Sequence, residues 1–299
     1  MKKLLIIGSP LELQESANPG IAEFAGRAIN SGEVAISYCR IDQIVYVVDN
    51  QAARMINGVT GEDISENDLV WLRGRLASSV NDVANIANYL KDKGVESRNS
   101  FYSGRRAVGK IAQMYLLARN NLPIARTVVA PHEYVTEYVE KFLTYPLILK
   151  DCYGSHGEQN YLVRGREQLA QILADNPGVR FMAQQFIKGT GDYRILFAGS
   201  EHLIIHRRGS DDTHLNNTSQ GAKASLIPDN EFPQQIVADA RAFADLQEYE
   251  IAGVDAIIDD ETGQHYFLEI NSQPQVESGA FVPEKEQLLG SYFRNLLGL

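Results

Sequence analysis

Short apolar runs separated by amphipathic stretches fill the first hundred residues. The pattern predicts four strands, at 4–8, 34–38, 44–48 and 69–73. Between 80 and 94 apolar residues recur at helical spacing, and Gly94 can end that helix. Strands that alternate with helical stretches are typical of a small open α/β sheet. We therefore expect an α/β domain over residues 1–102, ending in the polar segment 98–106.

Beyond this segment the pattern predicts two further units. A helix over 107–120 is followed by strands at 146–150, 159–163 and 180–187, with a short helix at 167–174 between them. Two strands between 192 and 207, a helix over 232–247 and strands at 251–260 and 263–274 come next. We expect units over 103–188 and 189–299, so the fold class is α/β with an α+β C-terminal part.

Composition excludes several classes of function. The 299 residues include 28 Lys and Arg against 38 Asp and Glu, a net charge of -10, which argues against a nucleic-acid groove. No apolar run approaches the length of a membrane span or of a signal-peptide core. Cys39 and Cys152 lie far apart without metal-ligand spacing and are expected to be reduced thiols. We expect a soluble cytoplasmic protein.

The last two predicted strands carry oxygen ligands in apolar surroundings. Glu269 and Asn271 lie two apart, so their side chains leave one face of an extended chain, and Asp255 on the neighbouring strand can lie opposite them. Burying carboxylates there is costly unless a cation compensates. Three oxygen ligands without His or Cys suit magnesium. A solvated strand edge with a turn-capping Asn is the alternative.

A glycine-bearing turn follows Lys150 at the end of an apolar strand. Gly154, Ser155 and Gly157 form the tip of a predicted hairpin, where backbone N–H groups can approach phosphate oxygens while Lys150 supplies charge. This predicts a nucleotide flap, although neither a Walker loop nor a dinucleotide fingerprint is present. A surface hairpin with an unrelated lysine explains the residues equally well.

Three later segments add polar groups next to strands. Gln184, Gln185, Phe186 and Ile187 combine extended backbone with an apolar wall, as adenine pockets do, although core packing also explains Phe186 and Ile187. Asp192 and Arg194 lie two apart on one strand face and are candidates for an ion pair. Arg207 and Arg208 end an apolar strand, where a guanidinium suits phosphate or carboxylate binding.

In this order, the motifs resemble the ATP-grasp superfamily, most closely the RimK-like carboxylate-amine ligases. The resemblance rests on Lys110, PLILK with its glycine tip, QQFI, D-x-R, HRR, Asn217 to Gly221, AGVD and LEIN-x-x-P, and covers roughly residues 69–280. It implies an ATP-grasp fold preceded by an N-terminal α/β sheet.

The resemblance also implies a role for each matched residue. Lys110 and Lys150 would hold the ATP phosphates under the flap of Gly154, Ser155 and Gly157. The adenine side would be lined by Gln184, Gln185, Phe186 and Ile187, with Asp192 and Arg194 towards the ribose. Two magnesium ions, or manganese in their place, would bind Asp255, Glu269 and Asn271. Arg208 and Asn217 would lie where an acyl phosphate forms.

The activity that the resemblance implies is amide-bond formation between a carboxylate and an amine through an acyl phosphate, with release of ADP and phosphate. An ATP-grasp ligase that crosslinks or extends a ribosomal peptide is one alternative, and a non-catalytic nucleotide-binding module is another. The chain departs from the pattern at Leu215, Gln220 and Gln275, near the acceptor side. The substrates, small molecule or peptide, therefore stay open. Members of that family often form dimers or tetramers, so a homo-oligomer is compatible with the resemblance.

Overall fold

A computed structural model describes residues 1–9, 20–30, 32–48, 53–73, 80–100, 109–154, 159–209 and 223–299. Some of the positions singled out in the sequence lie outside these ranges. They are most of the predicted 98–106 boundary, Ser155 and Gly157 of the predicted flap, and Leu215, Asn217 and Gln220.

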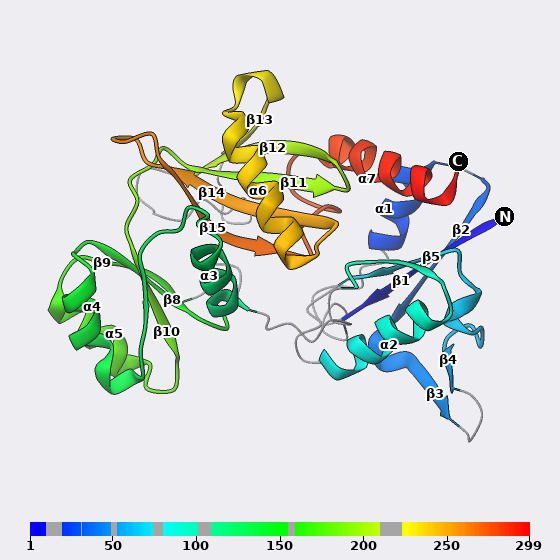
Figure 1. Ribbon diagram of the computed structural model, residues 1–299, viewed down its shortest axis with the longest axis horizontal. Coiled ribbons are helices and arrows are strands. Elements are labelled where there is room, and N and C mark those ends of the chain that lie inside the picture. The colour runs from blue at the N-terminus through cyan, green and yellow to red at the C-terminus, as the bar shows by residue number, and fades with distance from the viewer. Residues whose placement is uncertain are drawn as a thin grey trace.

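Four parallel strands form the N-terminal sheet, in the order β2-β1-β5-β6. The strands β1, β2 and β5 confirm three of the predicted strands, and α2 confirms the predicted helix. Leu4 and Ile6 face α1 and α7, whereas Leu5 and Ile7 face α2, so helices cover both faces (Figure 1). The elements are β1 Lys2–Gly8, α1 Gly20–Ile29, β2 Val34–Arg40, β5 Leu69–Leu72, α2 Val80–Asp92, β6 Glu96–Arg98 and α7 Val282–Leu297.

The prediction that residues 44–48 belong to this sheet is wrong. β3 (Ile44–Val48) pairs antiparallel with β4 (Ala53–Asn57) in a separate two-stranded hairpin. Only the short 3₁₀ turn Ile41–Gln43 separates β3 from β2. A strand can join its predecessor in parallel only after a crossover of a dozen or more residues, so β3 turns away.

The second sheet is antiparallel, in the order β7-β10-β8-β9. Apolar residues of α4 and α5, among them Val139 and Leu169, pack on one face of it against Leu147, Leu149 and Phe181. The predicted strand at 180–187 ends at Gln185, so Phe186 and Ile187 follow it. The elements are β7 Thr127–Val129, α4 Val135–Phe142, β8 Leu147–Asp151, β9 Asn160–Val163, α5 Arg166–Asp175 and β10 Phe181–Gln185.

The third sheet is also antiparallel, in the order β13-β12-β11-β14-β15. Helix α6 covers one face, where Phe232 and Phe243 contact Tyr193 and Phe267. Helix α3 (Lys110–Arg119) contacts the edge strand β15, where the Gln113 side-chain amide donates to the Ile270 carbonyl at 2.9 Å. The elements are β11 Asp192–Ala198, β12 Glu201–Arg208, β13 Lys223–Ile227, α6 Gln234–Gln247, β14 Ile251–Ile258 and β15 His265–Asn271.

The C-terminal helix α7 joins the third sheet to the N-terminal domain. Leu289 and Phe293 of α7 share one apolar cluster with Phe24 of α1 and with Leu196 of β11. The Arg294 guanidinium donates to the Ala28 carbonyl at 2.9 Å, at the end of α1. Figure 1 shows α7 lying beside α1. Helix α7 therefore packs on both the N-terminal domain and the third sheet.

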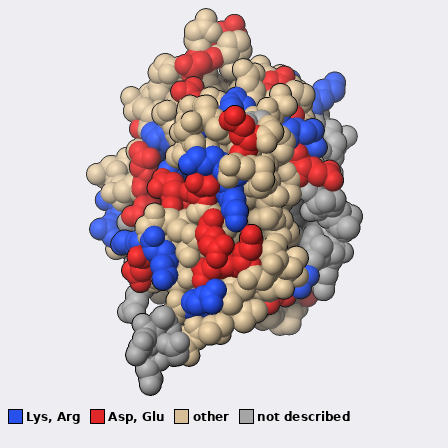
Figure 2. Space-filling model, turned by 90° about the vertical axis from the view of Figure 1, so that its right-hand side faces the viewer, with Lys and Arg blue, Asp and Glu red and all other residues tan. Residues whose placement is uncertain are grey.

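The distribution of surface charge and the state of the two cysteines agree with the composition of the chain. Figure 2 shows basic and acidic groups interspersed on the face it presents, without a continuous basic surface. Among the described residues, none of the helices has the length and apolar character needed to cross a membrane. Cys39 and Cys152 are buried and free, as expected from their spacing.

Candidate active site

The candidate site lies between the faces of the second and third sheets that their helices leave uncovered. Lys150 leaves β8 on the side opposite Leu149, which packs on α4 and α5. On the third sheet, Asp192 and Arg194 alternate with Tyr193, which faces α6. The charged residues of both sheets thus avoid the helix-packed cores.

Four charged side chains form a continuous network across β11, β12 and β14. Arg194 binds both carboxylate oxygens of Asp255, at 2.8 and 2.7 Å. Arg207 donates to Asp192 at 2.6 Å and lies 3.1 Å from Asp255. The sequence placed Asp192 and Arg194 together as a candidate pair. Each instead pairs with a residue directly opposite it on a neighbouring strand, because the register aligns Asp192 with Arg207 and Arg194 with Asp255.

The two carboxylates of this network differ in acidity. Burial raises the pKa of Asp192 to about 6, against the opposing charge of Arg207 and with the help of Asp255. Burial also acts to raise the pKa of Asp255, but Arg194 and Arg207 outweigh it, so that pKa lies below its usual value. Asp255 is therefore held as an anion, and Asp192 is the more easily protonated partner.

The predicted metal ligands come together on β14 and β15. Asp255 lies directly opposite Glu269, and Asn271 donates its side-chain N–H to Glu269 at 2.9 Å. This donor set fits a magnesium ion, because the Asn271 carbonyl oxygen and the carboxylate oxygens of Asp255 and Glu269 are all hard oxygen ligands. Within the described part of the chain, no three His, Cys, Asp or Glu side chains cluster as a metal site. Asn271, water and phosphate oxygens would therefore have to complete the coordination.

Lys150 connects the two sheets electrostatically. Burial lowers the pKa of Lys150, and Lys110 lowers it further, whereas Glu269, Asp192 and Asp255 oppose the shift. Four charged groups from separate segments thus act on Lys150. An anion with several negative oxygens, such as a polyphosphate, would balance the two ammonium groups there.

Lys110 holds the beginning of the predicted flap. Its ammonium donates to the Asp151 carbonyl at 3.0 Å and to the Gly154 carbonyl at 2.6 Å. A Cβ at Gly154 would lie 3.0 Å from Asp151 Cβ, so a larger residue there would crowd Asp151. Lys110 begins helix α3, where a cation at the N-terminus is unfavourable unless such acceptors compensate.

The predicted adenine segment is divided by the end of β10. Gln184 is buried and donates to the Thr127 hydroxyl at 3.0 Å. Gln185 is exposed, and its backbone N–H donates to the Arg126 carbonyl at 2.9 Å. Ile187 is buried and Phe186 partly buried. The Gln184 side chain therefore makes its hydrogen bond inside the protein, so that of this segment only Gln185, Phe186 and Ile187 can contact a ligand.

Arg207 holds the central position of the site, although the sequence analysis gave a catalytic role to its neighbour Arg208. Strand alternation places Arg208 on the α6 side with His206, which stacks on Tyr193, whereas Arg207 faces Asp192 and Asp255. The apolar strand ending in two arginines was a usable signal, but only the register shows which arginine points at the carboxylates.

Two further residues lie near the site: Lys285, which the sequence analysis missed, and Arg73, which ends the predicted strand at 69–73. Lys285 of α7 donates to the Gln275 and Ser278 carbonyls, both at 3.0 Å, and burial together with nearby Arg194 lowers its pKa to about 8. Arg73, at the end of β5, donates to Glu277 at 2.7 Å. Both residues hold the segment that follows Asn271 against the rest of the molecule.

The family of the chain follows from a match to a family model. The model of the RimK-like ATP-grasp domain matches residues 107–281, which include every described candidate site residue. The chain belongs to this family of RimK-like ATP-grasp proteins.

Two relatives resemble parts of the chain in sequence. A coenzyme gamma-F420-2:alpha-L-glutamate ligase of Methanocaldococcus jannaschii is 27% identical over 166 residues, which are 53% of this chain and 56% of that protein. A pyruvate carboxylase of Pichia angusta is 26% identical over 81% of this chain but only 20% of its own length. The chain thus spans little more than half the length of the first of these relatives.

A solved structure matches over the whole length. The RiPP-associated ATP-grasp ligase of Chryseobacterium gregarium, in complex with ADP and with a leader and core peptide, aligns with a TM-score of 0.70 at 15% identity. The alignment covers 100% of this chain and 97% of that one. The chain therefore has the ATP-grasp fold, including the N-terminal α/β sheet.

Proposed function

We propose that the protein is an ATP-dependent carboxylate-amine ligase that forms an amide bond through an acyl phosphate. The observation that carries this proposal is the convergence of Lys110, Asp192, Asp255 and Glu269 on Lys150 between two sheet faces. Two ammonium groups opposite a set of carboxylates suit a magnesium nucleotide, and the family match and the glutamate-ligase relative support the same activity.

In the first proposed step, a substrate carboxylate oxygen attacks the γ-phosphorus of ATP, and the bond from that phosphorus to the β–γ bridging oxygen breaks. Lys110 and Lys150 neutralise charge on the phosphate oxygens. One or two magnesium ions, held by Asp255, Glu269 and Asn271, would polarise the transferred group. Arg194 and Arg207 fix the orientation of Asp255.

In the second step, an amine attacks the acyl carbon, phosphate leaves and the nitrogen loses a proton. The tetrahedral oxyanion needs a donor. Arg208, which the sequence predicted for this role together with Asn217, leaves β12 on the side away from Asp192 and Asp255, so only Asn217 stays a proposed donor. Gly154 to Gly157 would close over the nucleotide and exclude water, which otherwise hydrolyses the acyl phosphate.

The test is a hydroxylamine-trapping screen. The protein, ATP and magnesium are incubated with single amino acids and short peptides, and the hydroxamate and ADP are measured. We expect magnesium-dependent hydroxamate with one class of carboxylate. The Glu269→Gln variant should give none, whereas Glu261→Gln, in an exposed turn, should behave as the wild type. ADP release without hydroxamate across the whole panel would contradict the ligase assignment.

A further inference from the structure

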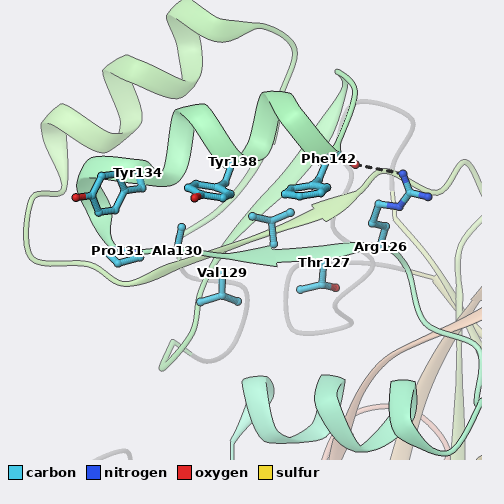
Figure 3. Close-up of a pocket in the computed structure, with 9 residues that line it drawn as sticks. Arg126, Thr127, Val129, Ala130, Pro131, Tyr134, Tyr138 and Phe142 are labelled. Atoms are coloured by element: carbon cyan, nitrogen blue, oxygen red, sulfur yellow. Dashed lines mark hydrogen bonds between the residues drawn. The ribbon is translucent and has the colours of Figure 1, made fainter.

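A groove of about 640 Å³ lies outside the candidate active site, between strand β7 and helix α4. Figure 3 shows the side chains of Tyr138 and Phe142 of α4, and of Tyr134 in the 3₁₀ turn just before it, on the side that faces β7. These three aromatic side chains are 49%, 39% and 47% exposed, although they lie on one stripe of a helix. The ATP reaction proposed above uses none of them.

The groove opens along the edge of a sheet. Its lining includes six consecutive residues, 126–131, so the groove follows the whole length of β7. Among the described strands, only β10 pairs with β7, which is the first strand in the sheet order. The outer edge of β7 therefore presents backbone N–H and C=O groups to a ligand.

The spacing of the aromatic side chains fits an extended chain. They lie four residues apart along the 3₁₀ turn and α4, and the rings of Tyr138 and Phe142 stack with centroids 6.3 Å apart. Two residues of a β-strand advance by roughly 6.6 Å, so alternate side chains of a strand lying along β7 would meet successive rings. A helical ligand, with apolar residues three and four apart, would not match both the strand edge and this ladder.

The two ends of the groove differ in charge. Near Phe142 lie Arg126, whose guanidinium donates to the Phe142 carbonyl at 3.3 Å, and Lys141, whose ammonium lies 5.5 Å from the Phe142 ring. Exposed Glu133 and Glu137 lie towards the Tyr134 end. An acidic residue on the ligand is therefore favoured next to Phe142.

We propose that this groove binds an extended peptide segment, which adds to β7 as a further strand. Apolar side chains at alternate positions pack between the aromatic rings, and an acidic residue lies at the Phe142 end. Because β7 pairs with β10, which pairs with Lys150-bearing β8, the bound segment lies on the sheet that holds the nucleotide. That this segment belongs to a substrate of the ligase rests on the proposed function, whereas the binding itself does not.

The test uses a displayed library of random heptapeptides, selected on the full-length protein. Enriched sequences should carry apolar residues two apart and an acidic residue at one end. The Tyr138→Ala and Phe142→Ala variants should each weaken binding of the synthesised peptides about tenfold or more by calorimetry. Tyr115→Ala, which removes a more exposed aromatic side chain from α3, is the control and should bind unchanged.

Backbone pairing is tested separately. N-methylation of alternate peptide amides should abolish binding in one register and leave the other register unchanged, because only every second amide faces β7. No enrichment, or equal binding by the Tyr138 and Phe142 variants, would overturn the proposal. It would also be overturned by concentration-dependent dimerisation that these substitutions abolish, since a second copy would then occupy the groove. ATP-dependent hydroxamate formation is read independently, so failure here leaves the ligase proposal intact.

Discussion

At the scale of single residues, the candidate site is a set of buried charges whose partners lie on neighbouring strands. The sequence shows that Asp192, Arg194 and Asp255 are flanked by apolar residues, which predicts that each needs a partner or a cation. It does not show the register, which decides the pairs. The structure adds Arg207, which binds Asp192 and approaches Asp255, as the charge that lets two carboxylates coexist.

Replacing Arg207 therefore tests this network. Arg207→Met leaves Asp192 and Asp255 without their shared cation and should lower the free energy of unfolding by about 3 kcal/mol. Without Arg207 the folded pKa of Asp192 rises beyond about 6, so stability present at low pH is lost as pH rises through that value. The loss should be larger at pH 8 than at pH 5 in urea unfolding.

Arg208→Met is the matched control for that substitution, because Arg208 is exposed and leaves the strand on the other side. Its stability should stay within about 0.5 kcal/mol of the wild type. Equal losses in the two variants would show that Arg207 has no special role in the fold.

Lys150 should contribute to nucleotide binding rather than to stability. Burial lowers its pKa, so the charged ammonium is unfavourable in the unliganded fold. Lys150→Met should leave the free energy of unfolding unchanged or raised, but weaken ATP binding by about 1.5–3 kcal/mol. Calorimetry with ATP and urea unfolding without it measure the two effects. Lys188→Met, at an exposed ion pair with Glu261, should change neither. An unaltered ATP affinity would remove Lys150 from the site.

At the scale of elements, the pattern of apolar and polar residues predicted the central strands well. β1, β5, β8, β11 and β14 each coincide with a predicted strand, and β1, β5 and β14 are continuous buried runs rather than alternating ones. Short edge strands such as β7 and β6 are too brief for a pattern to appear. Helix α4 was missed because only Val135 and Val139 are buried, while its exposed aromatic residues obscure the polar face. β3 was assigned to the wrong sheet because a connection length, not its composition, sets its partner.

The beginning of the flap gives a prediction at this scale. Gly154→Ala would place a methyl group 3.0 Å from Asp151 Cβ and disturb the carbonyl that Lys110 binds. We expect about a fivefold loss of ATP affinity and faster proteolysis of the hairpin in magnesium ATP. Gly165→Ala is the control, because no atom lies within 4 Å of its added Cβ. Full protection by nucleotide in the Gly154 variant would rule out this role for the turn.

At the scale of the whole molecule, α7 connects the third sheet, which carries the predicted magnesium-binding residues, to the N-terminal sheet. The sequence predicted three consecutive units, and each of the three larger sheets lies within one of them. It did not predict that the last helix returns to the first unit. Such a contact joins residues more than 250 positions apart, and no local pattern encodes it.

Gly290 makes this return possible, since a methyl group there would overlap the Ala28 carbonyl oxygen. Gly290→Ala should lower the free energy of unfolding by about 2–3 kcal/mol through overpacking. Exposed Gly178→Ala, with no atom near its added Cβ, should change it by less than about 0.5 kcal/mol. Denaturant unfolding compares the two. A Gly290 variant as stable as the wild type would mean that α7 and α1 do not pack closely in solution.

The central claim is that the meeting point of the second and third sheets holds magnesium ATP. The most direct measurement is calorimetric titration of ATP with and without magnesium, for the wild type and for Glu269→Gln. We expect magnesium to strengthen ATP binding to the wild type about tenfold or more, and to have little effect on the variant, because Glu269 lies opposite Asp255 at the proposed ion. The exposed Glu261→Gln variant should respond to magnesium as the wild type does. The claim is contradicted if the wild type does not bind ATP, or if magnesium strengthens binding equally in the Glu269 variant.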